Sequence, residues 1–142
     1  MDNTSPKGTQ TRPTSNGADV VNMFLSAFAA GDIEAAVNCL DSKCLVNEAH
    51  GLPFSGTYVG QEGFLSLLGA MSADLDASVD KIEVLDSGDS VVGRIALTFV
   101  AKTSGDKLAT TGVDIYQVRD GKIVDIDVYY KDPGAVAALV GK

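Results

Sequence analysis

Two ionisable side chains stand close together in a stretch that is otherwise mostly apolar, and they are strong candidates for chemistry. Glu48 and His50, the only histidine, lie two residues apart in the segment LVNEAHG. Side chains at positions i and i+2 of a strand point to the same face, so we expect Glu48 and His50 to share one surface. A carboxylate beside an imidazole can abstract a proton, but burying both is costly unless they are paired or hydrogen-bonded. The pattern therefore predicts either a satisfied polar cluster or a functional cavity.

Asp114 is a third candidate because it lies between Val113 and Ile115 in an apolar segment that reads as a strand. One interpretation is a structural carboxyl group that hydrogen-bonds to neighbouring Tyr or Thr side chains. The other is an acid in a pocket, with a pKa raised by burial. For His50, the alternative to a catalytic position is a solvated one at the end of the strand.

The composition bounds the class of protein. With 142 residues and 45% hydrophobic content, the chain suits one domain with a real core. The net charge of −8 repels phosphate backbones and anionic lipid surfaces. No apolar run approaches the roughly 20 residues that span a bilayer, and the polar N-terminus lacks the apolar segment of a signal peptide. We therefore expect a soluble, cytoplasmic protein with no nucleic-acid partner and no membrane partner.

The two cysteines, Cys39 and Cys44, have no second cysteine pair and no histidine at a zinc-ligand spacing. A transition-metal site needs several converging ligands, and the chain has a single histidine. We expect two free buried thiols, no metal and no cofactor.

The first half of the chain reads as a tail followed by helices. Residues 1–17 are polar and predict a disordered tail, which leaves residues 18–142 as the domain. From Asp19, apolar residues recur every three or four positions, which predicts a helix with Asp19 as its cap and Gly31 as its end. A second short helix is predicted over 32–40, with Asp32 as its cap.

Further elements follow the strand that carries Glu48. The Gly-rich stretch 53–63 predicts a loop, and 64–75 has the apolar spacing of a third helix. The last residues, DPGAVAALV, predict a short helix or arm.

After residue 77 the apolar period changes to two. Segments rich in Val, Ile, Tyr and Thr follow one another, separated by the turns SGD, SGD and DG, at 78–86, 90–103, 107–119 and 122–130. Short turns of this kind join antiparallel neighbours. Helices grouped before such a meander are typical of the α+β class, in which the helices pack on one face of a curved antiparallel sheet.

Segments in a fixed order resemble the nuclear-transport-factor-2-like superfamily, the fold shared by ketosteroid isomerase and the SnoaL-like polyketide cyclases. AGDIEAAVNCLDSKCLVNEAHG resembles the second helix and first strand of the isomerases. GLPFSGTYVGQEGFLSLL resembles the loop and following helix of SnoaL-like proteins, and VDIYQVRDGKIVDIDVYY resembles the last hairpin of the superfamily. The resemblance covers residues 19–131.

The resemblance implies a cone-shaped fold, in which a curved antiparallel sheet wraps around three N-terminal helices and encloses a central pocket. On the isomerase pattern, Glu48 takes the position of the general base and Asp114 that of the protonated carboxylic acid. Phe24 stands where the isomerases have the tyrosine of the oxyanion hole. Loss of such a donor can cost about 2.7 to 4 kcal/mol of transition-state stabilisation, which argues against steroid isomerisation by the familiar machinery.

Aromatic and aliphatic residues of the helices, the loop and the last strands are the expected lining of this pocket, and they favour a small hydrophobic ligand. A filled core without a cavity is the alternative. The expected lining residues are Phe24, Phe28, Leu52, Phe54, Tyr58, Phe64, Leu68, Met71, Tyr116, Val128 and Tyr130.

The favoured function is a cofactor-independent enzyme that acts by acid/base chemistry on a small hydrophobic, oxygenated molecule of polyketide, terpenoid or steroid type. Glu48 would move a proton, His50 would assist it and Asp114 would donate to the developing oxyanion, as in an isomerase, cyclase or dehydratase. Epoxide hydrolysis ranks lower, with Arg94 as the candidate arginine. The alternatives are a non-catalytic ligand-binding module and a dimerisation scaffold.

A homodimer is expected in each case. Residues 95–100 are largely apolar on both faces of their strand, which suits a sheet buried on both sides.

Overall fold

A curved sheet forms the frame of the molecule in the computed structural model, which describes residues 13–141. Its six strands lie in the order β2-β1-β6-β5-β4-β3. The bounds are β1 Leu40–Glu48, β2 Gly56–Val59, β3 Leu75–Asp86, β4 Val91–Ala101, β5 Lys107–Arg119 and β6 Lys122–Tyr130. Strands β3 to β6 are antiparallel neighbours, β1 joins β6 in parallel, and β2 pairs with β1 at the edge.

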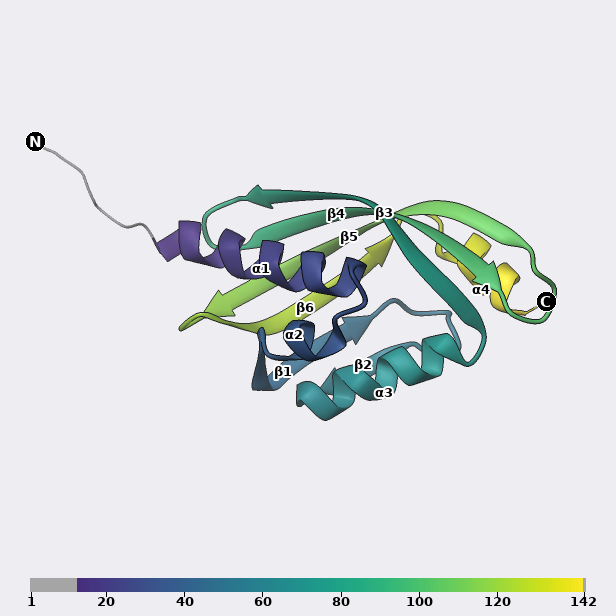
Figure 1. The fold of residues 1–142 in the computed structure, drawn as a ribbon, viewed down its shortest axis with the longest axis horizontal. Helices are drawn as coiled ribbons and strands as arrows, with labels where there is room; N and C mark the ends of the chain where they lie inside the picture. Colours follow the sequence, from purple (N-terminus) through teal and green to yellow (C-terminus); the bar gives the residue numbers. More distant parts are fainter. Residues whose placement is uncertain (1–12, 142) are drawn as a thin grey trace, which may run out of the picture.

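Helices cover one face of this sheet. The helices are α1 Pro13–Ala29, α2 Ile33–Val37, α3 Gly60–Ser72 and α4 Pro133–Val140. Figure 1 shows α1, α2 and α3 on the same side of the sheet, with α4 alongside the end where β4 turns into β5. Helix α1 packs against β3 and helix α3 against β1. This is the α+β arrangement that the order of the periodic segments predicts.

The β5–β6 hairpin has the bounds predicted from the sequence. The alternation of apolar and polar residues and the two-residue turn both indicate the same strand ends. Asp120 and Gly121 both have positive φ, of 53° and 76°, which is the backbone of a type I′ turn and suits the right-handed twist of the two strands. A register shift lies between Gln117 and Val118, so that Val118 pairs with Ile123 and Val124 is skipped. This bulge brings Ile126, Val128 and Tyr130 to the inner face.

Other boundaries differ from those predicted. Helix α1 begins at Pro13, whose fixed φ suits a first helical turn, so Asp19 lies inside the helix and does not cap it. Residues 13–17 of the predicted tail belong to this helix, and its residues 1–12 lie outside the described range. Helix α2 does have Asp32 as its cap, with the Asp32 carboxylate accepting from the Ala35 N–H at 3.2 Å.

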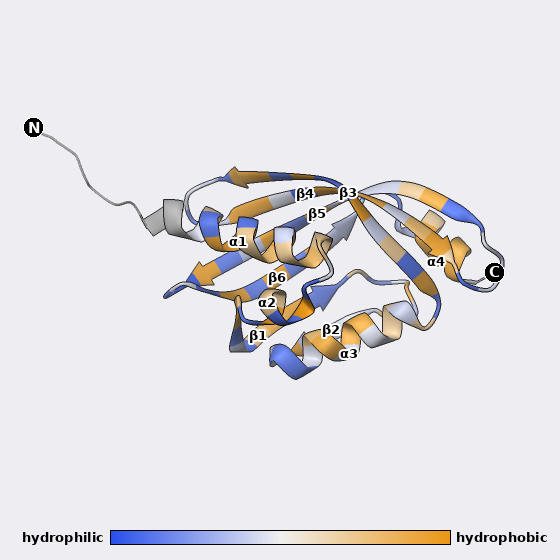
Figure 2. Cartoon of the chain, in the orientation of Figure 1, coloured by the Kyte–Doolittle hydropathy of each residue, from blue (hydrophilic) through white to orange (hydrophobic). Residues whose placement is uncertain are grey.

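The Gly-rich stretch predicted as a loop contains a strand. Residues 56–59 form β2, and helix α3 starts directly after it at Gly60. Figure 2 shows that α3 starts with hydrophilic residues and is hydrophobic in its middle, where Phe64 and Leu67 are buried and Leu65 is exposed. Within residues 13–141, no helix has both the length and the hydropathy that a bilayer span requires.

Candidate functional site

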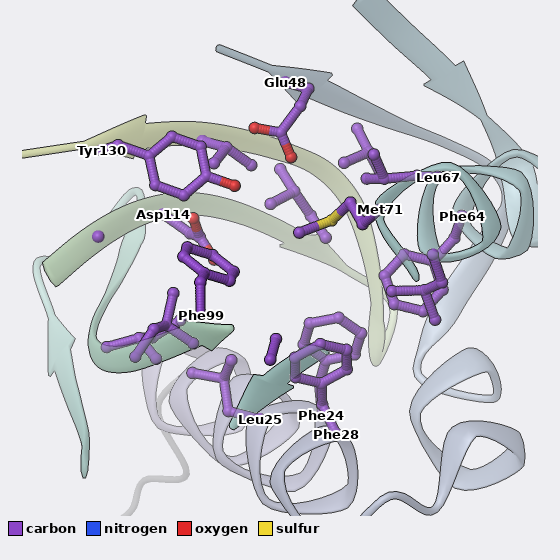
Figure 3. A pocket seen from close by; sticks show the side chains of 18 residues that line it. Phe24, Leu25, Phe28, Glu48, Phe64, Leu67, Met71, Phe99, Asp114 and Tyr130 are labelled. Atoms are coloured by element: carbon purple, nitrogen blue, oxygen red, sulfur yellow. The ribbon is translucent and has the colours of Figure 1, made fainter. Parts of the chain in front are cut away.

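An apolar cavity of about 100 Å³ lies between the inner face of the sheet and helices α1 and α3. Three phenylalanines form its helical wall, with ring centroids 5.6 Å apart for Phe24 and Phe64 and 6.5 Å apart for Phe28 and Phe64. In Figure 3, Glu48, Tyr130 and Asp114 stand on the side of the cavity away from these rings. The lining residues are Phe24, Leu25, Phe28, Val46, Glu48, Phe64, Leu67, Leu68, Met71, Ala77, Ile95, Leu97, Phe99, Gly112, Asp114, Ile126, Val128 and Tyr130.

Glu48 is the last residue of β1, and the alternation of that strand points it inward. Cys44, Val46 and Glu48 are the buried positions at the end of the strand, and Glu48 is 6% exposed. The Glu48 Oε1 atom accepts a hydrogen bond from the Ala49 N–H at 3.0 Å, and the Tyr130 hydroxyl donates a second one. Burial raises the pKa of the Glu48 carboxyl above its usual value, although both hydrogen bonds lower it.

Asp114 lies on the neighbouring part of the inner face, in the middle of β5. Its Oδ2 atom accepts a hydrogen bond from the Tyr116 hydroxyl at 2.9 Å, across the i to i+2 spacing of one strand face. Burial raises the pKa of Asp114 to about 7, and the charge of Glu48 adds to the rise while the bond from Tyr116 opposes it. At neutral pH this carboxyl group is therefore protonated in a large share of the molecules.

A glycine makes room for this arrangement. Gly93 of β4 pairs with Asp114, and a Cβ atom there would meet Leu25 Cδ1 and Tyr116 Cε1 at 3.0 Å. A larger residue would push the Tyr116 ring away from its place under Phe24, where the two ring centroids are 6.1 Å apart. The absence of a side chain at Gly93 thus lets helix α1 approach the sheet and keeps Tyr116, the hydrogen-bond partner of Asp114, in place.

The two carboxyl groups and their tyrosines act as one unit. The charge of Glu48 raises the pKa of Asp114, and the charges of both carboxyl groups raise the pKa of Tyr130, which lies partly buried beside them. A ligand in the cavity can therefore meet a proton acceptor, a protonated carboxyl group and a phenolic hydroxyl on one side, and hydrocarbon on the others. Phe24 brings no hydroxyl group, but Tyr130 does.

Several predicted residues line the cavity and others do not. Phe24, Phe28, Phe64, Leu68, Met71, Val128 and Tyr130 line it together with Glu48 and Asp114. His50 does not, because β1 ends at Glu48 and His50 lies exposed in the following turn, so the expectation that both share one strand face is wrong. Tyr116 lies behind the wall and acts on the cavity only through Asp114.

The predicted lining residues of the loop are also placed elsewhere. Leu52 and Phe54 are buried in the core but are not part of the cavity wall. The Tyr58 hydroxyl donates to the Phe54 carbonyl oxygen at 2.8 Å, which ties Tyr58 to the loop. The side chains of Leu52 and Phe54 therefore belong to the hydrophobic core and not to the cavity wall.

The sequence interpretation missed the wall formed by the middle of the sheet. Ile95, Leu97 and Phe99 alternate along β4 and line the cavity, as Ala77 of β3 and Gly112 of β5 also do. The period-two pattern of residues 95–99 was the available signal for these positions.

Other candidate groups lie away from the cavity. The Arg94 guanidinium is 57% exposed and pairs with Glu83 at 3.4 Å on the outer face, so it is not in the position that an epoxide hydrolase would need. Cys39 and Cys44 are free and buried, as predicted. Among residues 13–141, no three His, Cys, Asp or Glu side chains are placed to share a metal ion.

Solved structures share this fold at low sequence identity. The crystal structure of TerC with polyporic acid superposes with a TM-score of 0.80 at 19% identity, covering 89% of this chain and 99% of that one. A nuclear-transport-factor-2-like protein of unknown function from Burkholderia pseudomallei has a TM-score of 0.80 at 15% identity, with coverages of 89% and 98%. A candidate polyketide cyclase from Xanthomonas campestris has a TM-score of 0.77 at 23% identity, with coverages of 89% and 98%.

The sequence itself also matches a family model. No curated protein matches the chain. The model of the SnoaL-like domain matches residues 21–126, which span both helices of the cavity wall, Glu48 and Asp114. The chain therefore belongs to the SnoaL-like domain family.

Proposed function

We propose that this protein is a cofactor-independent enzyme that moves a proton on a small, largely apolar molecule with a carbonyl group. The observation that carries the proposal is the pair Glu48 and Asp114, two carboxyl groups with raised pKa values in an otherwise apolar cavity, each hydrogen-bonded by a tyrosine. Titratable groups with strongly shifted pKa values cluster at catalytic sites because proton transfer near neutral pH requires such values.

The roles follow from the two protonation states. Ionised Glu48 takes a proton from a carbon atom next to the carbonyl group and becomes neutral, and the C–H bonding pair forms an enolate. Protonated Asp114 donates a hydrogen bond to the enolate oxygen, which stabilises the developing charge in a site without bulk water. The Tyr130 hydroxyl donates to Glu48 while Glu48 is ionised, and it can turn to the enolate oxygen once Glu48 is neutral. Tyr116 holds Asp114 in place through its hydrogen bond and is a positioning residue.

The substrate class follows from the wall. Hydrocarbon side chains form most of it, so an apolar ring or chain with one oxygen function fits best. An isomerase, a cyclase and a dehydratase all start from this proton abstraction. The candidate cyclase and TerC share the fold, which favours an oxygenated substrate of polyketide type among these classes.

The test is proton exchange on a probe ketone. We expect the protein to accelerate the exchange of the ring CH₂ hydrogens of 2-indanone in D₂O, followed by ¹H NMR. Glu48→Gln should lower the protein-catalysed rate by about 100-fold or more, because a general base contributes about that factor. Glu83→Gln on the outer face is the matched control and should keep the wild-type rate, since Glu83 pairs with Arg94 away from the cavity.

A non-catalytic ligand-binding module is the second candidate, and the absence of a hydroxyl group at Phe24 favours it. In that case 2-indanone would bind, seen as a shift of the Met71 methyl signal at the cavity wall, while the exchange rate stayed at that of buffer. Binding without exchange in the wild-type protein would therefore overturn the enzyme proposal.

A further inference from the structure

A second hollow, here called the notch, adjoins the cavity on the other side of Glu48. It has a volume of about 380 Å³. Glu48, Val128 and Tyr130 line both the notch and the cavity, whereas His50, Asp127 and Tyr129 line the notch alone. One layer of side chains therefore separates the two spaces, and the carboxyl group of Glu48 is in that layer.

The parallel pairing of β1 with β6 accounts for the notch. Parallel neighbours end at the same edge of the sheet, and no hairpin can join them there. Asn47 pairs with Asp127, and just beyond this pair the two chains separate, one toward β2 and the other toward α4 at Pro133. The gap between the diverging chains opens beside Glu48, the last residue of β1.

Asp114, in contrast to Glu48, does not line the notch. It lines the cavity, and its carboxylate accepts a hydrogen bond from the buried Tyr116 hydroxyl. Glu48 is 6% exposed and Asp114 is partly buried, so the exposed fraction does not separate the two carboxyl groups, whereas the notch does, because only Glu48 lines it. Once a ligand fills the cavity, water in the notch still lies beside Glu48, whereas the notch does not reach Asp114.

We propose that Glu48 exchanges its proton with solvent through the notch while the ligand occupies the cavity. The inference rests on the proposed function for the role of Glu48 as the base. After Glu48 has taken a proton from the ligand, neutral Glu48 gives that proton to a water molecule in the notch and becomes a carboxylate again. A solvent proton then returns by the same route and is delivered to the enolate carbon, so the product carries hydrogen from solvent. Asp114 keeps its proton throughout as the hydrogen-bond donor.

Carboxyl labelling tests this access without any turnover. The full-length protein is treated with a water-soluble carbodiimide and glycine ethyl ester, and the modified residues are identified by peptide mass spectrometry. The experiment is repeated with benzene in the cavity, since apolar cavities of comparable size take up benzene. The Met71 methyl signal reports that the cavity is filled.

We expect Glu48 to be labelled at the same rate with and without benzene, and Asp114, which lines the cavity but not the notch, to remain unlabelled once benzene fills the cavity. His50→Trp should slow the labelling of Glu48 by about tenfold, because the indole fills part of the notch from an exposed turn where folding tolerates it. Ala49→Phe should do the same from a second position, and Ser104→Trp in a distant exposed turn is the control that should change nothing.

Labelling of Glu48 that stops when benzene fills the cavity, and that His50→Trp leaves unchanged, would overturn the inference, because Glu48 would then be reached from the cavity. Absence of labelling in every state would overturn it as well. Neither result depends on ketone exchange. A protein that shows the expected labelling but exchanges no 2-indanone would therefore refute the proposed function alone.

Discussion

The ionisation of Asp114 links the stability of the folded protein to pH near neutrality. Its pKa rises from 3.8 to about 7 on folding, so between these values the folded protein binds this proton more tightly than the unfolded chain. By linkage, the free energy of unfolding falls as the pH rises through this window and stays low above it. A shift of about three pH units corresponds to about 4 kcal/mol.

Asp114→Asn removes this pH dependence because the amide is neutral at every pH, and its oxygen can still accept from Tyr116. At about pH 8.5 we expect the variant to be more stable than the wild type by about 1 to 4 kcal/mol, the amide N–H groups costing part of the gain. At about pH 5 the advantage should vanish, since wild-type Asp114 is then neutral. Urea unfolding at the two pH values measures this.

The control for this experiment is Asp89→Asn in an exposed turn, which removes one negative charge as Asp114→Asn does at about pH 8.5. A difference in stability between Asp114→Asn and the wild type that is the same at both pH values would show that Asp114 is not neutral in the folded protein.

The catalytic candidates could be found in the sequence only where they interrupt an apolar pattern. Glu48 and Asp114 did so in strands, and both face the cavity. His50 looked equivalent, but a two-residue spacing places side chains on one face only while the strand continues, and the strand ends at Glu48. Ile95, Leu97 and Phe99 are indistinguishable from ordinary core residues in a sequence, because a cavity is a property of packing and not of composition.

At the scale of elements, the position of helix α3 depends on one glycine. Gly60 has φ +74°, and a Cβ atom there would lie 2.5 Å from the Ser42 carbonyl oxygen of β1. The first residue of α3 is thus pressed against β1, and the helix carries Phe64, Leu67 and Met71 of the cavity wall.

Gly60→Ala should destabilise the protein by about 3 kcal/mol or more, because backbone strain and a clash with backbone add together. Gly31→Ala is the matched comparison, since Gly31 has φ +78° with nothing within 4 Å of a Cβ atom. We expect this variant to lose only about 1 kcal/mol, the cost of the left-handed conformation alone. Equal losses in urea unfolding would contradict the close contact between α3 and β1.

The elements differ in how well the sequence defines them. The bounds of β5 and β6 were predicted because alternation, β-branched residues and a two-residue turn all agree there. Strand β2 was missed, since four residues flanked by glycines carry almost no periodic signal and the strand forms by pairing with β1. Tertiary pairing of this kind is not encoded locally.

At the scale of the whole molecule, the homodimer stays a prediction. Residues 95, 97 and 99 face the cavity, and Ala96, Thr98 and Val100 lie half-buried on the opposite face of β4. We expect sedimentation velocity at micromolar concentration to give the mass of a dimer, and Ala96→Arg to give a folded monomer because the guanidinium would be buried in the contact. A monomeric wild-type protein would contradict this prediction.

The parallel contact of β1 with β6 also constrains how the chain reaches its native state. The two strands are joined by no local turn, and Val46 must find Ile126 across almost the whole domain. Contacts of such sequence separation close late, because the entropy of the long loop is lost before they form. During synthesis, β1 leaves the ribosome well before β6 is made. The edge of β1 that pairs with β6 therefore stays unpaired until then. We therefore expect the candidate active site to be the last part of the domain to form, and nascent chains that end before β6 to depend on chaperones.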